Sequence, residues 1–285
     1  MKTTGKNRYF SYVLMYGAYY FATAMFGAII SIYLIGIGLS AVRISLLISI
    51  SSYIFFSVFI IAAAFGVLMI RTGEEKTDSA ARKDVSRNYK REVLKNGNFI
   101  KYLIITAAFY CTMSLNAVYL PALYQSEGVA VTTVTTIMFI STMMEIPVIF
   151  FAARFMEKLH NMQLMTVSFS IAFLQFLLYV LIPVPAVQAV VTMLCRSTST
   201  MIYIMINMKV IADIVPPAYQ MSALTLVTAL SGSLTSIIMQ NVGGQIIDHF
   251  SIRALYIFMA GIMALGLILL YVLKVPKGRK RDMFN

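Results

Sequence analysis

The sequence contains few of the side chains that catalysis, metal binding and disulfide formation require. Among 285 residues there are only two histidines and two cysteines. His160 and His249 fall at the ends of different apolar segments, and a metal cluster or a Ser-His-Asp triad would need more than these two. Cys111 and Cys195 lie within apolar runs, which is typical of buried thiols that pack as small hydrophobes. No metal, cofactor or disulfide is expected, and an enzyme is not indicated.

Charge is also scarce. Charged residues make up 12% of the chain and hydrophobic residues 60%, whereas a soluble domain has about 25% charged and about 45–50% apolar residues. This composition indicates a polytopic membrane protein. No G-x-x-x-x-G-K-[ST] loop occurs and no soluble domain is large enough to bind ATP, which argues against a primary pump. A channel, a gradient-driven transporter and a structural membrane subunit remain.

Eight apolar segments are long enough to cross a bilayer, at about 20 residues each. Their predicted limits are 9–35, 44–70, 99–124, 131–155, 164–182, 187–208, 222–247 and 252–273. Segments of this length with short links are predicted to be helices, because a helix satisfies every backbone group within one segment. The expected fold is therefore an all-α membrane bundle of about eight helices.

One polar stretch, residues 71–97, interrupts these segments and carries eight basic and five acidic residues. It has too little apolar surface to offset its own ordering entropy. It divides the chain into a two-helix unit (1–70), a linker (71–97), a six-helix unit (98–274) and a basic tail (275–285).

Basic residues are distributed unevenly across the predicted membrane. With the N-terminus in the cytoplasm, 20 of the 23 Lys and Arg residues fall on the cytoplasmic side and two on the other, and Arg196 lies within a span. This bias predicts a multi-pass protein of the inner (cytoplasmic) membrane with both termini and the linker in the cytoplasm. It also explains the net charge of +12 without a nucleic-acid partner.

Two ionisable residues fall inside predicted spans. An ionised side chain at the bilayer centre costs at least about 2.5–3.5 kcal/mol, so Glu145 and Arg196 are functional candidates. Their predicted depths differ by about 9 Å at 1.5 Å per residue. One interpretation is that Glu145 binds a proton or a polar substrate and Arg196 supplies the counter-charge. The alternative is a structural ion pair or polar packing between helices.

Other polar groups could line the same cavity. Pro147 follows Glu145 by two residues and is predicted to kink that helix. Asn116 and Asn207 are amides within spans, and Tyr16 and Tyr20 belong to a helical stripe that could hydrogen-bond a hydroxylated ligand. Packing between helices explains the amides and phenols equally well.

Four stretches carry a resemblance to a known family. They are SLNAVYLPALYQSEGV (114–129), MMEIPVIFFAARFMEKLHNMQLM (143–165), IVPPAYQMSALTL (214–226) and NVGGQIIDHFSIRALYIFMAGI (241–262). In order and spacing they resemble helices seven to twelve of a major facilitator superfamily transporter. The resemblance is strongest to the oligosaccharide and nucleoside proton symporter branch, which is lactose-permease-like. It implies proton-coupled transport of a small polar solute by alternating access.

The front third departs from that family pattern. Residues 12–47 resemble helix one and the start of helix two, and residues 59–75 resemble the end of helix six. Helices three to five have no counterpart. Arg196 falls where lactose-permease-like proteins have a proton-relay histidine, Ser199 where they have an acid, and Thr142 where they have a substrate-binding acid. The family's proton relay is therefore not reproduced residue for residue.

The sequence thus favours a secondary transporter of a sugar- or nucleoside-like solute. Two alternatives stay open. The chain could be a truncated, inactive relative or one that works only as a homo-oligomer, since two helices replace six. It could also be a membrane scaffold that keeps the fold without transport.

Overall fold

The computed structural model describes residues 95–216 and 219–273, together with Leu34, residues 37–40, Arg43, Leu47 and Val93. The side chains of residues 152–155 and 157 are not among those described. Nearly all of the predicted first and second spans, most of the linker and the basic tail lie outside the described residues, as do Tyr16 and Tyr20.

The described residues contain six helices long and apolar enough to cross a membrane. Their bounds are Gly97–Ser126, Val131–Phe151, Asn161–Leu181, Pro185–Ile214, Gln220–His249 and Ile252–Leu273. Each matches one predicted span of the six-helix unit to within six residues at either end. An all-helical, polytopic membrane bundle is thereby confirmed for this part of the chain, whereas the total of eight helices stays a prediction.

The first described helix, α4 (Gly97–Ser126), begins at a side-chain cap. Asn96 Oδ1 accepts hydrogen bonds from the backbone N–H groups of Asn98 (3.0 Å) and Phe99 (3.4 Å). These bonds satisfy two of the donors that a helix start leaves unpaired. Pro121 lies inside α4, yet α4 continues through it to Ser126.

The second span is broken in its middle. It consists of α5 (Val131–Met143) and α6 (Glu145–Lys158), with Met144 in a turn between them. Pro147 cannot donate to the carbonyl of Met143, and its ring crowds that carbonyl, so the α-helical ladder is interrupted here. The interruption falls at Met144, three residues before Pro147, next to the position where a kink is predicted. It makes Glu145 the first residue of a new helix.

Two further spans carry π-helical segments. One consists of α8 (Pro185–Val191), η2 (Thr192–Arg196) and α9 (Ser197–Ile214). The other consists of α10 (Gln220–Val227), η4 (Thr228–Leu234) and α11 (Thr235–His249). Each segment begins at a threonine whose hydroxyl donates to a backbone carbonyl of the preceding turn, a bond that can distort a helix. Thr192 donates to Gln188 O (2.8 Å), and Thr228 donates to Leu224 O (3.0 Å).

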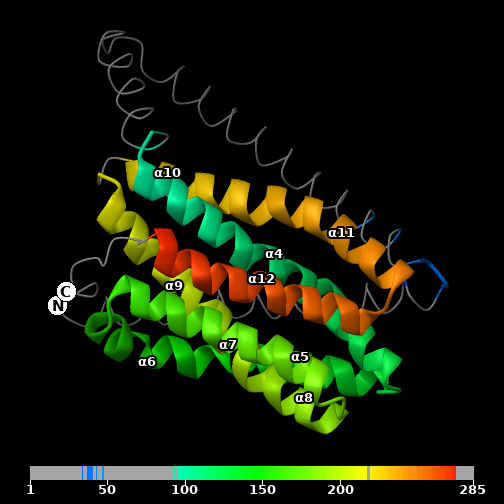
Figure 1. The fold of residues 1–285 in the computed structure, drawn as a ribbon. Helices are drawn as coiled ribbons and strands as arrows, with labels where there is room; N and C mark the ends of the chain where they lie inside the picture. The colour runs from blue at the N-terminus through cyan, green and yellow to red at the C-terminus, as the bar shows by residue number, and fades with distance from the viewer. Residues whose placement is uncertain are drawn as a thin grey trace, which may run out of the picture.

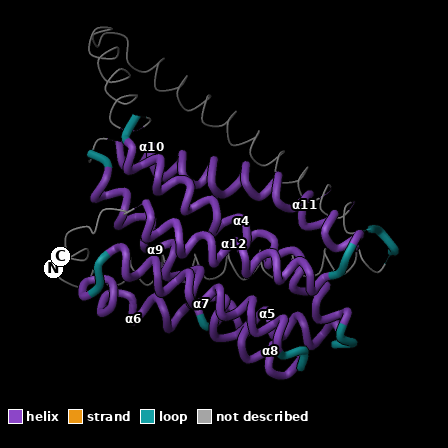
Figure 2. The backbone as a smooth tube through the Cα atoms, in the orientation of Figure 1, coloured by secondary structure: helices purple, strands orange, loops and turns teal. Residues whose placement is uncertain are grey.

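The described helices lie side by side as one bundle (Figures 1 and 2). The helices α7 (Asn161–Leu181) and α12 (Ile252–Leu273) make the most extensive contact, and α12 also packs on α4. Gly266 of α12 allows this approach, because a Cβ atom there would collide with the ring of Phe169 on α7. Elsewhere α4 packs on η4 and α11, α5 on η2, and α6 on α9.

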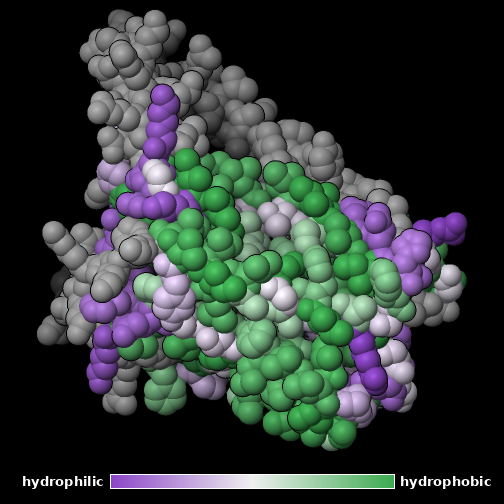
Figure 3. Space-filling view, in the orientation of Figure 1, coloured by the Kyte–Doolittle hydropathy of each residue, from purple (hydrophilic) through white to green (hydrophobic). Residues whose placement is uncertain are grey.

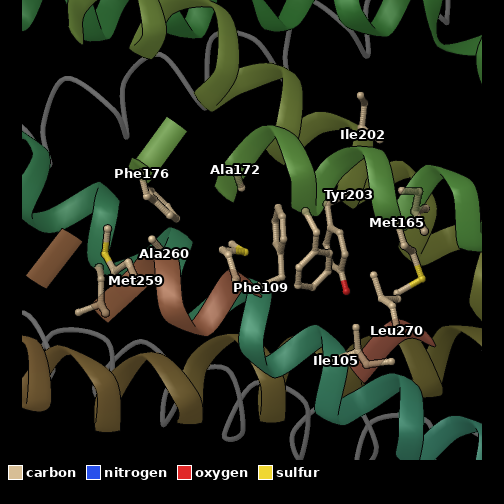
Figure 4. Packing of buried hydrophobic residues seen from close by; sticks show 14 of the residues in the cluster. Ile105, Phe109, Met165, Ala172, Phe176, Ile202, Tyr203, Met259, Ala260 and Leu270 are labelled. Atoms are coloured by element: carbon tan, nitrogen blue, oxygen red, sulfur yellow. The ribbon is translucent and has the colours of Figure 1, made fainter. Parts of the chain in front are cut away.

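Aromatic side chains dominate the core between α4, α7 and α9. Phe109 stacks on Tyr203 with ring centroids 3.9 Å apart (Figure 4). The ring of Phe169 packs against both. Large apolar side chains also cover much of the outer surface, where Figure 3 shows a wide apolar face with polar residues gathered at its two ends. An apolar exterior between polar ends is the surface expected of a bundle that spans a bilayer.

Candidate functional site

The helix break and the first π segment face each other. Ser141, in the last turn of α5, lies 3.1 Å from the hydroxyl of Ser197 and is within 3.2 Å of the carbonyl of Thr192, to which it can donate. Ser197 Oγ also donates to the carbonyl of Ser141. All three side chains are buried. This hydroxyl contact, the Ser141–Ser197 clamp, fixes the end of α5 against the middle of the α8–α9 span.

The two predicted charges lie next to this clamp in the chain, one on each span. Glu145 follows Ser141 by one turn and Arg196 immediately precedes Ser197. Both side chains are half-buried, and their charges attract each other. Within the described residues they form no direct ion pair, so the interaction acts through space. Such attraction is strong in a low-dielectric interior.

Glu145 has a second source of stabilisation in its position. It is the acidic residue in the first turn of α6, where the unpaired N–H groups and the helix dipole favour negative charge. A helix that starts inside a membrane thus offers a site for an anion. In this chain the carboxylate of Glu145 occupies that position. Breaks of this kind are typical of transporter binding sites.

Arg196 also lies near a group of buried phenols that sequence reasoning missed. Its charge interacts with the side chains of Tyr124, Tyr179 and Tyr256. Two of these phenols converge on one hydroxyl, that of Thr192, at 2.7 Å from Tyr124 and 2.6 Å from Tyr179. Thr192 donates its only proton to Gln188 O, so both phenols must donate to Thr192. Thr192, one helical turn before Arg196, thus joins α4, α7 and the π segment.

Amide side chains around this phenol group retain unused hydrogen-bonding capacity. Gln175 donates to Tyr179 (2.8 Å), Asn116 accepts from Tyr256 (3.3 Å), and Gln188 donates to Glu127 (3.0 Å). The three amides are almost fully buried, and each has one polar atom without a partner among the described residues. Because buried polar atoms are seldom left unpaired, these atoms could bond to water or to a polar ligand within the bundle.

Asn207 lies in a separate polar cluster. Its amide accepts from Tyr102 and donates to Tyr110 (2.8 Å), and Tyr203 donates to Thr106 (2.9 Å) close by. These contacts join α9 to α4. The structure thus places Asn116 next to the phenol group that surrounds Arg196, and Asn207 away from it in an interhelical contact.

A buried lysine holds one end of α6, which sequence reasoning also missed. Lys209 counts toward the basic surface in the sequence, but its side chain is only 2% exposed. Its ammonium donates to the carbonyls of Met156 and Leu159 at the end of α6, and it attracts Asp213. Asp213 accepts from Asn161 at the start of α7 (2.8 Å). An i,i+4 Lys–Asp pair next to a helix end was the available sequence signal.

Metal chemistry finds no support in the described part of the chain. It contains no group of three or more His, Cys, Asp or Glu residues placed to hold a metal ion. Cys111 and Cys195 are both free thiols.

Fold and site together define a class, namely a polytopic membrane helix bundle with a charged pair at a broken helix. A family model described as "MFS_1 like family" matches residues 4–258, and the chain belongs to this family. The resemblance to major facilitator transporters is thereby confirmed. The family points to a non-enzymatic transporter that works within the lipid bilayer.

One curated relative adds to this. The chain is 23% identical over 209 residues to the "Uncharacterized transporter YwbF" of Bacillus subtilis (strain 168). The aligned region covers 73% of this chain and 51% of the relative. The chain thus spans about half the length of the curated relative it matches. No solved structure matches the chain.

Proposed function

We propose that this protein carries a small polar solute, sugar- or nucleoside-like, across the inner membrane together with a proton. The observation that supports the proposal best is the pair Glu145–Arg196, held at the break between α5 and α6. Glu145 would take up and release the proton, and Arg196 would stabilise its ionised form. The phenols and unpartnered amides near Arg196 would contribute polar contacts.

Loading and unloading of Glu145 would change the forces on the two helices. With Glu145 ionised, its attraction to Arg196 favours contact between α6 and the π segment. With Glu145 neutral, that attraction is lost and Arg196 is left free to bind a polar solute. Binding of the proton and binding of the solute would thereby be coupled through Arg196.

The test uses purified protein in vesicles with an imposed pH gradient and radiolabelled lactose or uridine as probe. We expect wild-type protein to accumulate a probe and Glu145→Gln to abolish accumulation while keeping counterflow exchange. Asp248→Asn is the matched control, since Asp248 is an exposed acid near the end of α11, away from the residues assigned to the site. Gradient-driven uptake that survives Glu145→Gln would contradict the role of Glu145.

A purely structural charge pair predicts a different result. Arg196→Gln or Glu145→Gln alone would then reduce the yield of folded protein, because each leaves one charge uncompensated. The double variant would recover both folding and uptake. Recovery of uptake in the double variant would therefore argue against a proton-carrying Glu145.

Assembly of two copies is a second candidate requirement for transport. Alternating access needs two comparable bundles around one site, and the described residues form one six-helix bundle. We infer that a second copy could supply the partner bundle. Crosslinking in native membranes tests this: a dimer whose disruption abolishes uptake would support it, and a monomer with full uptake would rule it out.

A further inference from the structure

An apolar groove of about 380 Å³ opens between α6, α7 and α9, directly beside the helix break. Each of the three helices contributes to its lining, as does the turn after α6. The lining residues are Pro147, Val148 and Phe151 of α6, Leu159 of the turn, Leu164 and Val167 of α7, and Thr198 and Ile202 of α9. The groove is within the size range of small-molecule sites, about 300–1,000 Å³.

The walls offer a ligand almost nothing polar. The one hydroxyl among the lining side chains, that of Thr198, donates to the carbonyl of Leu194 in its own helix. Pro147 and Phe151 are exposed, and Val167 is 40% exposed, so the groove is open at the surface of the bundle. A polar solute would find no partner here, which separates this groove from the Glu145–Arg196 site.

The length of the groove matches one membrane leaflet. The residues that line it extend from Pro147, in the middle of the span, to Leu159, just past the end of α6. Twelve residues of helix cover about 18 Å, and half of the hydrocarbon core is about 15 Å thick. One acyl chain therefore fits between the bilayer centre and the interface.

A positive charge marks the interfacial end. Lys158, the last residue of α6, is exposed and immediately precedes Leu159. A basic side chain at the level of the headgroups attracts anionic lipid. We propose that this groove binds an anionic phospholipid, with one acyl chain along α6 and its phosphate at Lys158. The break at Pro147 gives the groove its inner end, so bound lipid would rest against the helix that presents Glu145.

The test uses phosphatidylglycerol that carries a photoreactive diazirine in its acyl chain, in vesicles with and without excess phosphatidylcholine. We expect wild-type protein to be labelled on α6 and α7 and to prefer phosphatidylglycerol. Val167→Trp, which fills the groove, should reduce labelling about tenfold. Leu174→Trp is the matched control, because it lies two turns further along α7, is 49% exposed and does not line the groove.

The charge is tested separately. Lys158→Gln should reduce the preference for phosphatidylglycerol about fivefold, Lys158→Arg should keep it, and Lys95→Gln, at another exposed lysine, should leave it unchanged. Equal labelling of the two tryptophan variants would overturn the proposal. So would a crosslink between copies through Phe151 that excludes the lipid. Elution of each variant as a single folded species shows that lost labelling reflects the groove.

Discussion

At the scale of single residues, hydroxyl groups decide where the charges lie. The hydroxyls of Ser141 and Ser197 join α5 to the span that contains the π segment. The hydroxyl of Thr192 accepts hydrogen bonds from two phenols and donates one to a carbonyl of its own helix. Each bond uses a side chain too short to reach far, so the helices must approach closely for it to form. The geometry around Arg196 therefore depends on residues that carry no charge.

Thr192→Val tests this dependence. The change keeps the shape but removes three hydrogen bonds and leaves the hydroxyls of Tyr124 and Tyr179 without that acceptor. We expect the free energy of unfolding in detergent to fall by about 1–2 kcal/mol, measured by equilibrium denaturation. Thr136→Val is the control, because Thr136 is exposed and its hydroxyl donates to Thr132 O in its own helix (2.9 Å). Equal effects of the two changes would contradict the role of Thr192.

At the scale of helices, both charges lie at departures from regular helix. The break at Met144 makes Glu145 a helix start, and η2 ends at Arg196. Breaks and π segments are common at functional sites. Here one irregularity of each kind carries one member of the Glu145–Arg196 pair.

Pro147→Ala tests the break. Alanine restores the donor to Met143 O and favours a continuous helix through Met144. We expect uptake of the probe solute to fall sharply while resistance to unfolding is kept or raised. Spin labels at positions 135 and 158 should report a changed distance. Pro121→Ala is the matched control, since α4 is already continuous there, and it should alter neither. Full uptake with a straightened helix would show that the break is dispensable.

At the scale of the whole molecule, the bundle has two polar ends separated by an apolar surface (Figure 3). Ser126, the last residue of α4, lies at one end, and Lys158, the last residue of α6, lies at the other. Both residues are exposed. The Lys and Arg distribution predicts that the Lys158 end faces the cytoplasm.

Cysteine labelling tests this orientation. In a background with Cys111 and Cys195 replaced by alanine, a membrane-impermeant maleimide should label Ser126→Cys in intact cells. It should label Lys158→Cys only after the membrane is opened. The reverse pattern would invert the predicted topology and place the lipid groove in the outer leaflet.

Many features of the described bundle could be predicted from the sequence. The six spans follow from long apolar runs. In lipid, a single segment can satisfy all of its backbone hydrogen-bonding groups only as a helix. The kink follows from Pro147, since proline removes a donor wherever it occurs. Glu145 and Arg196 stand out because charge in a span is costly. The family could also be recognised from the order and spacing of four short sequence stretches.

The arrangement of the site depended on tertiary structure. Tyr124, Tyr179 and Tyr256 come from different helices, and no periodicity indicates that their hydroxyls meet near Arg196. The sequence predicts Lys209 to be a surface cation, whereas in the structure it is buried against the end of α6. Likewise, the groove beside Pro147 exists only where three helices meet. The sequence by itself thus determined the spans, the break and the two charges, which follow from local chemistry. Packing decided which polar groups meet, because such contacts join residues far apart in the chain.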